Sequence, residues 1–198
     1  SLAGAGGKLF RVQSTIGGIV FNDSFETARG WTLTGGWNSA TRGLWQRGNP
    51  QPTFNAGMPL QLGDCQGSAN CLITALPAGT SNGANDVDDG ITSIQSAPVA
   101  LPNTNRAITL AFGLYFAHNA NASSADLFRV RIVGENGVAQ TVWARAGAAR
   151  NVAGAWATRT ASLDAWAGQT IQIRIEALDG GAGSLIEAGV DNIAITVH

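Results

Sequence analysis

The fold is decided by a stretch that alternates apolar and polar residues, Asp126-Leu127-Phe128-Arg129-Val130-Arg131-Ile132-Val133. Successive side chains of a β-strand point to opposite faces, so Phe128, Val130 and Ile132 share one face and the arginines lie on the other. The pattern predicts a half-buried strand. Residues 169–177 alternate in the same way, with three isoleucines facing inward.

Further short strands are predicted on both sides of this stretch. Residues 106–116 are densely apolar, which indicates a strand buried on both faces. Asn136-Gly137 predicts a hairpin turn, and residues 188–197 predict a last strand. No window of helical length has an apolar stripe of period 3.6. Short strands separated by Gly and Asn therefore predict an all-β, antiparallel β-sandwich with jelly-roll topology.

Length and composition narrow the class of protein. The 198 residues suit one domain over residues 19–198, preceded by a glycine-rich linker or N-terminal extension over residues 1–18. A net charge of −1 gives no basic field for nucleic acid. No segment approaches the ~20 apolar residues of a membrane helix, so we expect no membrane insertion. Because the chain begins without the features of a signal peptide, we expect any export signal to lie outside this sequence.

Two cysteines, Cys65 and Cys71, lie close together in the sequence. Neither a nearby histidine nor a second cysteine pair is present to complete a zinc site. A local disulfide is one interpretation, which implies an oxidising compartment and contributes on the order of 2–2.5 kcal/mol in the chain-entropy model. The alternative is two reduced cysteines, with Cys71 facing the core.

Acidic residues gather in Asn85-Asp86-Val87-Asp88-Asp89-Gly90. Such a charge density requires a cation or ample water. The segments 23–26 and 187–191 also carry acidic residues, and a sandwich brings its first and last strands together. Calcium prefers six to eight hard oxygen ligands, so these segments are candidates for a structural calcium site. The alternative is that the aspartates are solvated turn formers that cap local backbone groups.

Six tryptophans raise the question of ligand binding. We expect Trp31 and Trp156 in the core. Trp37 and Trp45 have glycine-rich and arginine-rich surroundings, which suit either a surface or a packing role, and Arg47 could stack on their rings. An exposed cluster of Trp37, Trp45 and Arg47 would favour binding of sugar rings or peptide side chains.

Several short motifs follow one another in a fixed order, namely Phe25-Glu26 with Gly30-Trp31, Trp45-Gln46-Arg47-Gly48, residues 85–90 with Ser96-Ala97-Pro98, residues 126–130, Trp156, and residues 184–193. Together they resemble the MAM-like and carbohydrate-binding-module-like jelly-roll domains of secreted bacterial proteins. The resemblance covers roughly residues 20–197. One departure is the turn at residues 133–137, where the family usually has a Ser-x-Asp-Gly-Gly sequence.

The resemblance implies a non-catalytic accessory module of a secreted bacterial hydrolase, often a metallopeptidase. It also implies calcium near the first and last strands, with Glu26 and Asp191 as side-chain ligands. Asp23 could add a ligand, and Asp86, Asp88 or Asp89 could belong to the same site or to a second one. We therefore expect an extracellular module, stabilised by calcium, that binds polysaccharide or the protein substrate of the attached hydrolase.

Two other functions stay open. The chain could be a structural or adhesive surface domain that contacts partner proteins through its sheet faces or edges. It could also be a jelly-roll hydrolase in which carboxylates such as Glu176 and Glu187 face each other across a groove. A thiol dyad of Cys71 and His118 is a further template for such an enzyme.

Overall fold

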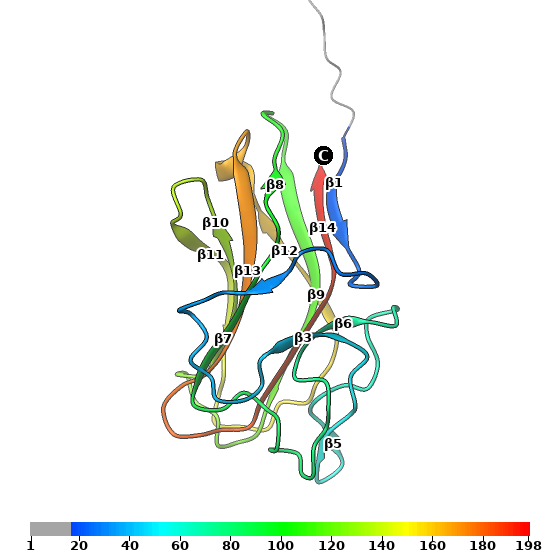
Figure 1. Cartoon of the computed structure of the whole chain (residues 1–198), viewed down its shortest axis with the longest axis vertical. Coiled ribbons are helices and arrows are strands. Elements are labelled where there is room, and N and C mark those ends of the chain that lie inside the picture. The colour runs from blue at the N-terminus through cyan, green and yellow to red at the C-terminus, as the bar shows by residue number, and fades with distance from the viewer. Residues whose placement is uncertain (1–16) are drawn as a thin grey trace, which may run out of the picture.

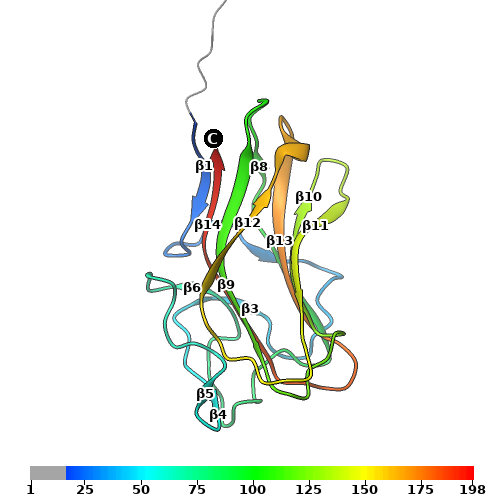
Figure 2. The same cartoon turned by 180° about the vertical axis from the view of Figure 1, so that it is seen from behind.

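The computed structural model describes residues 17–198 as two antiparallel β-sheets packed face to face (Figure 1, Figure 2). Residues 1–16 of the expected linker lie outside the described residues, and the first strand begins at Gly18. In the described part of the chain, no helix is long and apolar enough to cross a membrane.

Each sheet has six strands. Sheet A consists of β1 (Gly18–Asp23), β3 (Trp45–Gly48), β6 (Cys71–Thr74), β9 (Ile108–His118), β12 (Ala157–Ser162) and β14 (Ile186–Val197). Sheet B consists of β2 (Thr32–Leu33), β7 (Gly90–Gln95), β8 (Val99–Ala100), β10 (Leu127–Val133), β11 (Ala139–Ala146) and β13 (Thr170–Asp179). Two shorter elements lie outside the sheets, the hairpin of β4 (Phe54–Asn55) with β5 (Met58–Pro59) and the 3-10 helix η1 (Asp164–Trp166).

The strand order is that of a jelly roll. Sheet A contains the order β12-β9-β14-β6, and sheet B contains β11-β10-β13-β7. From β6 onward, the chain passes between the two sheets at most steps and returns beside an earlier strand. Two steps stay in sheet B, namely β7 to β8 and the β10–β11 hairpin, which turns at Gly137 with a φ of 73°. The predicted antiparallel sandwich with jelly-roll topology is therefore confirmed.

The main core lies between the sheets because the alternating strands turn their apolar sides inward. Phe128, Val130 and Ile132 of β10 are all buried on this side, as their alternation predicts. Trp45 is also buried in this core, whereas Trp31 is only partly buried and packs against it.

A second apolar cluster covers the outer face of sheet A. Residues 49–70 fold over β6 and β9, and Figure 1 shows the segment (cyan to green) as a lobe at the lower end of the sandwich. The predicted disulfide between Cys65 and Cys71 is present within this cluster. Trp156 packs here, with its ring centroid 4.9 Å from that of Tyr115, and not in the main core.

Strand β14 contains a β-bulge. Its core-facing residues are even-numbered up to Val190 and odd-numbered from Ile193 onward. The pairing with β9 shifts by one residue between Asp191 and Ala194, and Asn192 takes a positive φ of 49°. The extra residue restores the apolar side to the core for the second half of the strand.

Gly189 offers a direct test of this packing. A Cβ at this position would lie 2.3 Å from Cε1 of Tyr115 and 2.8 Å from Cδ1 of Ile73. We expect Gly189→Ala to reduce the free energy of unfolding by about 1–3 kcal/mol, which corresponds to roughly 2–4 °C of Tm per kcal/mol for a chain of this size. Gly183→Ala is the control, because its Cβ would meet no atom within 4 Å. Equal Tm values for the two variants would contradict the packing described.

Candidate functional site

The predicted ligand-binding residues Trp37, Trp45 and Arg47 do not form one exposed cluster. The Trp37 side chain is 51% exposed, and the guanidinium of Arg174 lies 5.7 Å from its ring centroid. Trp45 is only 3% exposed, and its indole Nε1 donates a hydrogen bond to the Thr92 carbonyl between the two sheets. Of the surface and packing roles that the sequence leaves open for Trp45, the structure shows the packing role, because β3 turns Trp45 into the core.

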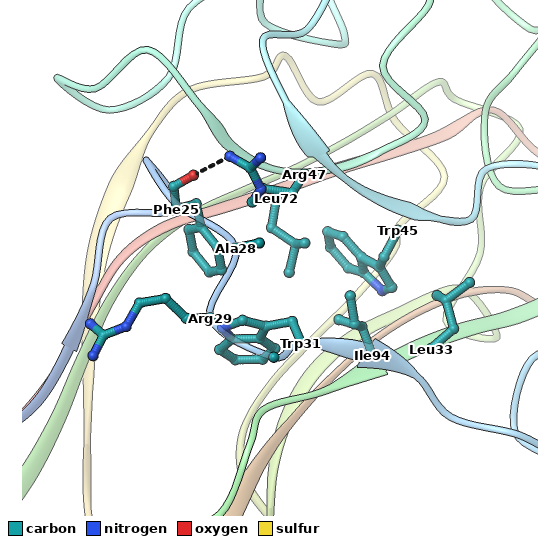
Figure 3. A pocket seen from close by; sticks show the side chains of 10 residues that line it. Phe25, Ala28, Arg29, Trp31, Leu33, Trp45, Arg47, Leu72 and Ile94 are labelled. Atoms are coloured by element: carbon teal, nitrogen blue, oxygen red, sulfur yellow. Dashed lines mark hydrogen bonds between the residues drawn. The ribbon is translucent and has the colours of Figure 1, made fainter.

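Trp45 and Arg47 line a pocket of about 200 Å³ at the open edge of the sandwich, between β2 and β3 (Figure 3). We call it the edge pocket, and its apolar walls come from Phe25, Trp31, Leu33, Leu72 and Ile94.

The arginines of the edge pocket are already used within the fold. Arg47 Nη1 donates to the Phe25 carbonyl at 2.9 Å, and Arg29 Nη1 donates to the Asn22 carbonyl. The first bond ties the turn after β1 to strand β3, and the second ties the same turn back to β1. The pocket is also smaller than the roughly 300–1,000 Å³ of typical ligand sites. We interpret it as the incompletely filled end of the main core.

A cluster of charged and polar side chains occupies the outer face of sheet B. Cross-strand register arranges it in two rows, with Ser93, Glu176 and Arg129 in one row and Gln95, Arg174 and Arg131 in the other. With Trp37 these six residues form what we call the polar face. The alternation of residues 126–133 and 169–177 signals that these side chains point away from the core. From the sequence, only Glu176 among them is a candidate, as half of a carboxylate pair with Glu187, and the others are not assigned to a site.

Glu176 is the centre of the polar face. Its side chain is 1% exposed, and its Oε2 accepts a hydrogen bond from Arg129 Nε. Its Oε1 lies 3.7 Å from Nη1 of Arg131 and accepts a hydrogen bond from the Ser93 hydroxyl at 3.5 Å. Both carboxylate oxygens therefore have partners.

The positive charges of the arginines are only partly neutralised by Glu176. Arg174 Nε donates to Gln95 Oε1 at 2.9 Å, and the Trp37 ring lies against its guanidinium. Burial lowers the pKa of Arg174, Glu176 opposes that shift, and the positive charges of Arg131 and Arg129 reinforce it. Nε of Arg131 is buried and has no hydrogen-bond partner among the described residues.

A hollow of about 330 Å³ continues the polar face. It is lined by Val133 and Gln172, which form the next outward-facing cross-strand pair after Arg131 and Arg174. Glu135 also lines it, and its Oε1 accepts a hydrogen bond from the Thr170 N–H at 2.8 Å. This volume lies within the range of ligand sites, in contrast to that of the edge pocket.

Two of the predicted metal ligands, Glu26 and Asp191, converge on the loop closed by the Cys65–Cys71 disulfide. Glu26 Oε1 accepts hydrogen bonds from two backbone N–H groups of this loop at 2.8 and 2.9 Å. Asp191 Oδ2 accepts from the Gln66 N–H at 2.9 Å and from the Ser68 hydroxyl at 2.6 Å. Burial raises the pKa of Asp191, and the nearby charge of Glu26 adds to this effect.

The other predicted metal ligands lie elsewhere. Asp23 accepts hydrogen bonds from the Phe25 N–H and the Trp31 indole, both at 2.8 Å. Asp86 accepts one from the Ile186 N–H at the start of β14, and Asp88 is close enough to raise its pKa. Ile186 precedes Asp191 by five residues, or roughly 16 Å along the strand. Among residues 17–198, no group of three or more Asp, Glu, His or Cys side chains is placed to hold a metal.

The enzyme templates drawn from the sequence do not match the geometry. Glu176 lies on the outer face of sheet B, whereas Glu187 points into the second cluster on the outer face of sheet A. The two sheets, spaced about 10 Å apart, separate them, so they cannot flank one sugar bond. The proposed dyad of Cys71 and His118 lacks its thiol because Cys71 is in the disulfide.

Asp86 leads to a prediction about pH. Its Oδ1 is buried without a hydrogen-bond partner, and burial, followed by the charge of Asp88, raises its pKa from 3.8 to about 7. The folded state therefore retains a proton that the unfolded state releases, so this group makes stability fall as pH rises from about 4 to 7. We expect Asp86→Asn to be more stable than the wild type at pH 8 by roughly 1–3 kcal/mol, with the difference shrinking toward pH 4.

Thermal melts over a range of pH measure these differences. Asp164→Asn is the control, because this change should lower the stability of the fold where Asp86→Asn raises it. A hydrogen bond from the Ile108 N–H, at 2.7 Å, lowers the pKa of Asp164. Its contribution to the stability of the fold is present above the pKa of 3.8 that it has in the unfolded state. This contribution is lost as pH falls through the lower pKa of the folded state. This variant should be less stable than the wild type at pH 7 and should approach it in acid. Parallel pH profiles for the wild type and Asp86→Asn would contradict the assignment for Asp86.

No protein-family model matches this chain, and no curated protein is a significant match. Among solved structures, the K3 cleaved adhesin domain of Lys-gingipain from Porphyromonas gingivalis W83 gives a TM-score of 0.47 at 15% identity, over 91% of this chain and 98% of that chain. The CBM22-1 xylan-binding domain of Paenibacillus barcinonensis Xyn10C gives a TM-score of 0.44 at 18% identity, over 91% of this chain and 95% of that chain. TM-scores below 0.5 place these structures too far from this chain to carry an argument about its function.

Proposed function

We propose that this chain is a non-catalytic, extracellular binding module that holds saccharide chains against the polar face of sheet B. The observation that carries the proposal is the exposed indole of Trp37 beside a row of outward-facing polar side chains. The apolar face of a sugar ring can stack on an indole, while guanidinium, amide and hydroxyl groups bond its hydroxyls.

The position of Trp37 is fixed before any ligand binds. The side-chain oxygen of Asn38 accepts a hydrogen bond from the Ser93 N–H at 2.7 Å, and its amide nitrogen donates to the Thr34 carbonyl at 2.6 Å. These bonds hold the segment that carries Trp37 against β7. A preorganised platform loses less conformational entropy on binding, which favours affinity for a flexible saccharide.

The polar face combines one exposed indole with charged hydrogen-bonding groups. The Trp37 ring lies against the guanidinium of Arg174, and Arg131 is opposite Arg174 on the neighbouring strand. An indole beside such groups suits a sugar ring, which has an apolar face and hydroxyl groups. The Cys65–Cys71 disulfide supports an oxidising, extracellular location. Attachment to an exported bacterial hydrolase is the part of the proposal that rests on the sequence motifs.

Calcium at Glu26 and Asp191 is a further part of the proposal. The two carboxylates approach the same loop, and the charge of Glu26 adds to the cost of ionising Asp191, so the pair fits a divalent cation. The Ser68 hydroxyl would add a third hard oxygen. Bound calcium would neutralise both carboxylates and fasten the turn after β1 to strand β14.

Truncation of Trp37 tests the binding proposal. We expect Trp37→Ala to weaken saccharide binding about thirtyfold, the usual cost of removing a tryptophan at the centre of a contact. Titration calorimetry against a panel of oligosaccharides measures it. Phe54→Ala is the matched control, because Phe54 is 54% exposed but lies on the β4–β5 hairpin. Unchanged affinity of Trp37→Ala, or a panel without any binder, would refute the proposal.

Thermal unfolding with calcium tests the cation site. A ligand that binds only the folded state raises Tm with its concentration, so calcium should raise Tm by a few degrees and a chelator should reverse the rise. Glu26→Gln and Asp191→Asn should lose this response, whereas Asp88→Asn should keep it. Equal Tm values in calcium and in chelator would rule out the site, and loss of the response in Asp88→Asn alone would place the cation elsewhere.

A further inference from the structure

The polar face has an excess of positive charge. Three guanidinium groups, from Arg129, Arg131 and Arg174, surround the single carboxylate of Glu176. They therefore leave two positive charges uncompensated within the cluster. The chain as a whole carries a net charge of −1, so this excess is a local feature of one face.

The register of the strands brings two of these arginines together. Arg131 of β10 is directly opposite Arg174 of β13. Side chains in such pairs have Cβ atoms about 4.5–5.5 Å apart, and like charges at this spacing are destabilising. Both side chains are also largely withdrawn from water, with 19% exposure for Arg131 and 9% for Arg174. An anion bound between the two guanidinium groups would reduce their repulsion.

The carboxylate of Glu176 does not fully neutralise the charges of Arg131 and Arg174. One of its oxygens is bonded to Arg129, and the other accepts a hydrogen bond from Ser93. The nearest Arg131 nitrogen stays 3.7 Å away, and Arg174 is bonded through Nε to the neutral Gln95. Arg131 Nη2 donates to the Ala139 carbonyl at 2.6 Å, and its buried Nε has no partner among the described residues. Neither Arg131 nor Arg174 therefore has a carboxylate at hydrogen-bond distance.

We infer that the polar face selects an anionic saccharide and binds its carboxylate or sulfate group between Arg131 and Arg174. This inference rests on the proposed function, because the sugar ring that carries the anion stacks on Trp37. The planar fork of a guanidinium bonds carboxylate and other oxyanions through two parallel N–H groups, a geometry that neutral hydroxyls do not match. A bound anion also removes the repulsion between the two arginines.

The neighbouring hollow sets the pattern of charge along the ligand. Its walls include the neutral side chains of Gln172 and Val133, and Glu135 adds a negative charge beside them. A second anionic group placed here would meet that carboxylate. The face therefore suits a saccharide whose anionic groups are separated by neutral sugars better than a continuous polyanion.

Calorimetry with three matched oligosaccharides tests the inference in the intact chain. The ligands are a neutral β-1,4-linked hexasaccharide, the same hexasaccharide with one uronate substituent, and its analogue with one sulfate. We expect at least one charged ligand to bind about tenfold or more tightly than the neutral one, as for hydrogen bonds to charged groups. Which of the two binds more tightly identifies the anion. The preference should shrink as salt is raised from 20 to 200 mM, since salt screens exposed charges.

Arginine variants assign the preference to the pair. Arg131→Gln and Arg174→Gln should each lose the preference for the charged ligand, while retaining or raising Tm because the like-charge repulsion is relieved. Arg159→Gln, on an exposed arginine of β12 in sheet A, is the matched control and should change neither property.

Different binding results would contradict the anion selectivity alone or saccharide binding as a whole. Equal binding of neutral and charged ligands, lost in Trp37→Ala, would overturn the anion selectivity and leave saccharide binding in place. Absence of binding to all three ligands would overturn both. Equally tight binding of a poly-glutamate peptide would show that the face recognises charge alone, which would also overturn the assignment to a saccharide.

Discussion

The fold depends on the way strand β14 shares its two edges. One edge pairs with β9 along nearly its whole length, whereas the other pairs with β6 at residues 189–190 and with β1 at residues 193–197. The ladder changes partner at the bulge formed by Asp191 and Asn192, where backbone polar groups would otherwise lack partners. Asp191 fills this break by accepting hydrogen bonds from the disulfide-closed loop, and Glu26 holds the same loop from the turn after β1. The carboxylates, the disulfide and the bulge thus form one structural unit.

This arrangement also decides which face of the sandwich is available for binding. The segment that includes the disulfide loop packs on the outer face of sheet A and buries Tyr115 and Leu60 there. The outer face of sheet B instead carries arginines, a glutamate and the exposed Trp37. The arginines and the glutamate stand on regular strands, so the β10–β13 register fixes their spacing. Trp37 lies in the turn after β2, which the hydrogen bonds of Asn38 hold against β7.

The sequence predicts the strands and the sandwich because alternation is a local property. Residues 126–133 and 169–177 show both the apolar face that becomes core and the charged face that becomes the candidate site. The pairing of Arg131 with Arg174 cannot be predicted from the sequence, because the register of two strands depends on contacts between distant parts of the chain. The sequence leaves the position of Trp45 open between surface and core for a related reason. Trp45 shares its side of β3 with Arg47, and only the closure of the sandwich over β3 buries it. The acidic residues 85–90 stand out by composition, but their depth of burial depends on tertiary packing.

We propose that ligands bind on the outer face of sheet B and not in the edge pocket. The most direct measurement is a titration of the isotope-labelled chain with the charged hexasaccharide, followed by NMR chemical shifts. We expect perturbations at the Trp37 indole N–H and along β10 and β13, centred on Arg131 and Arg174. Perturbations centred on Trp31 and Trp45, with the β10 and β13 signals unchanged, would contradict it.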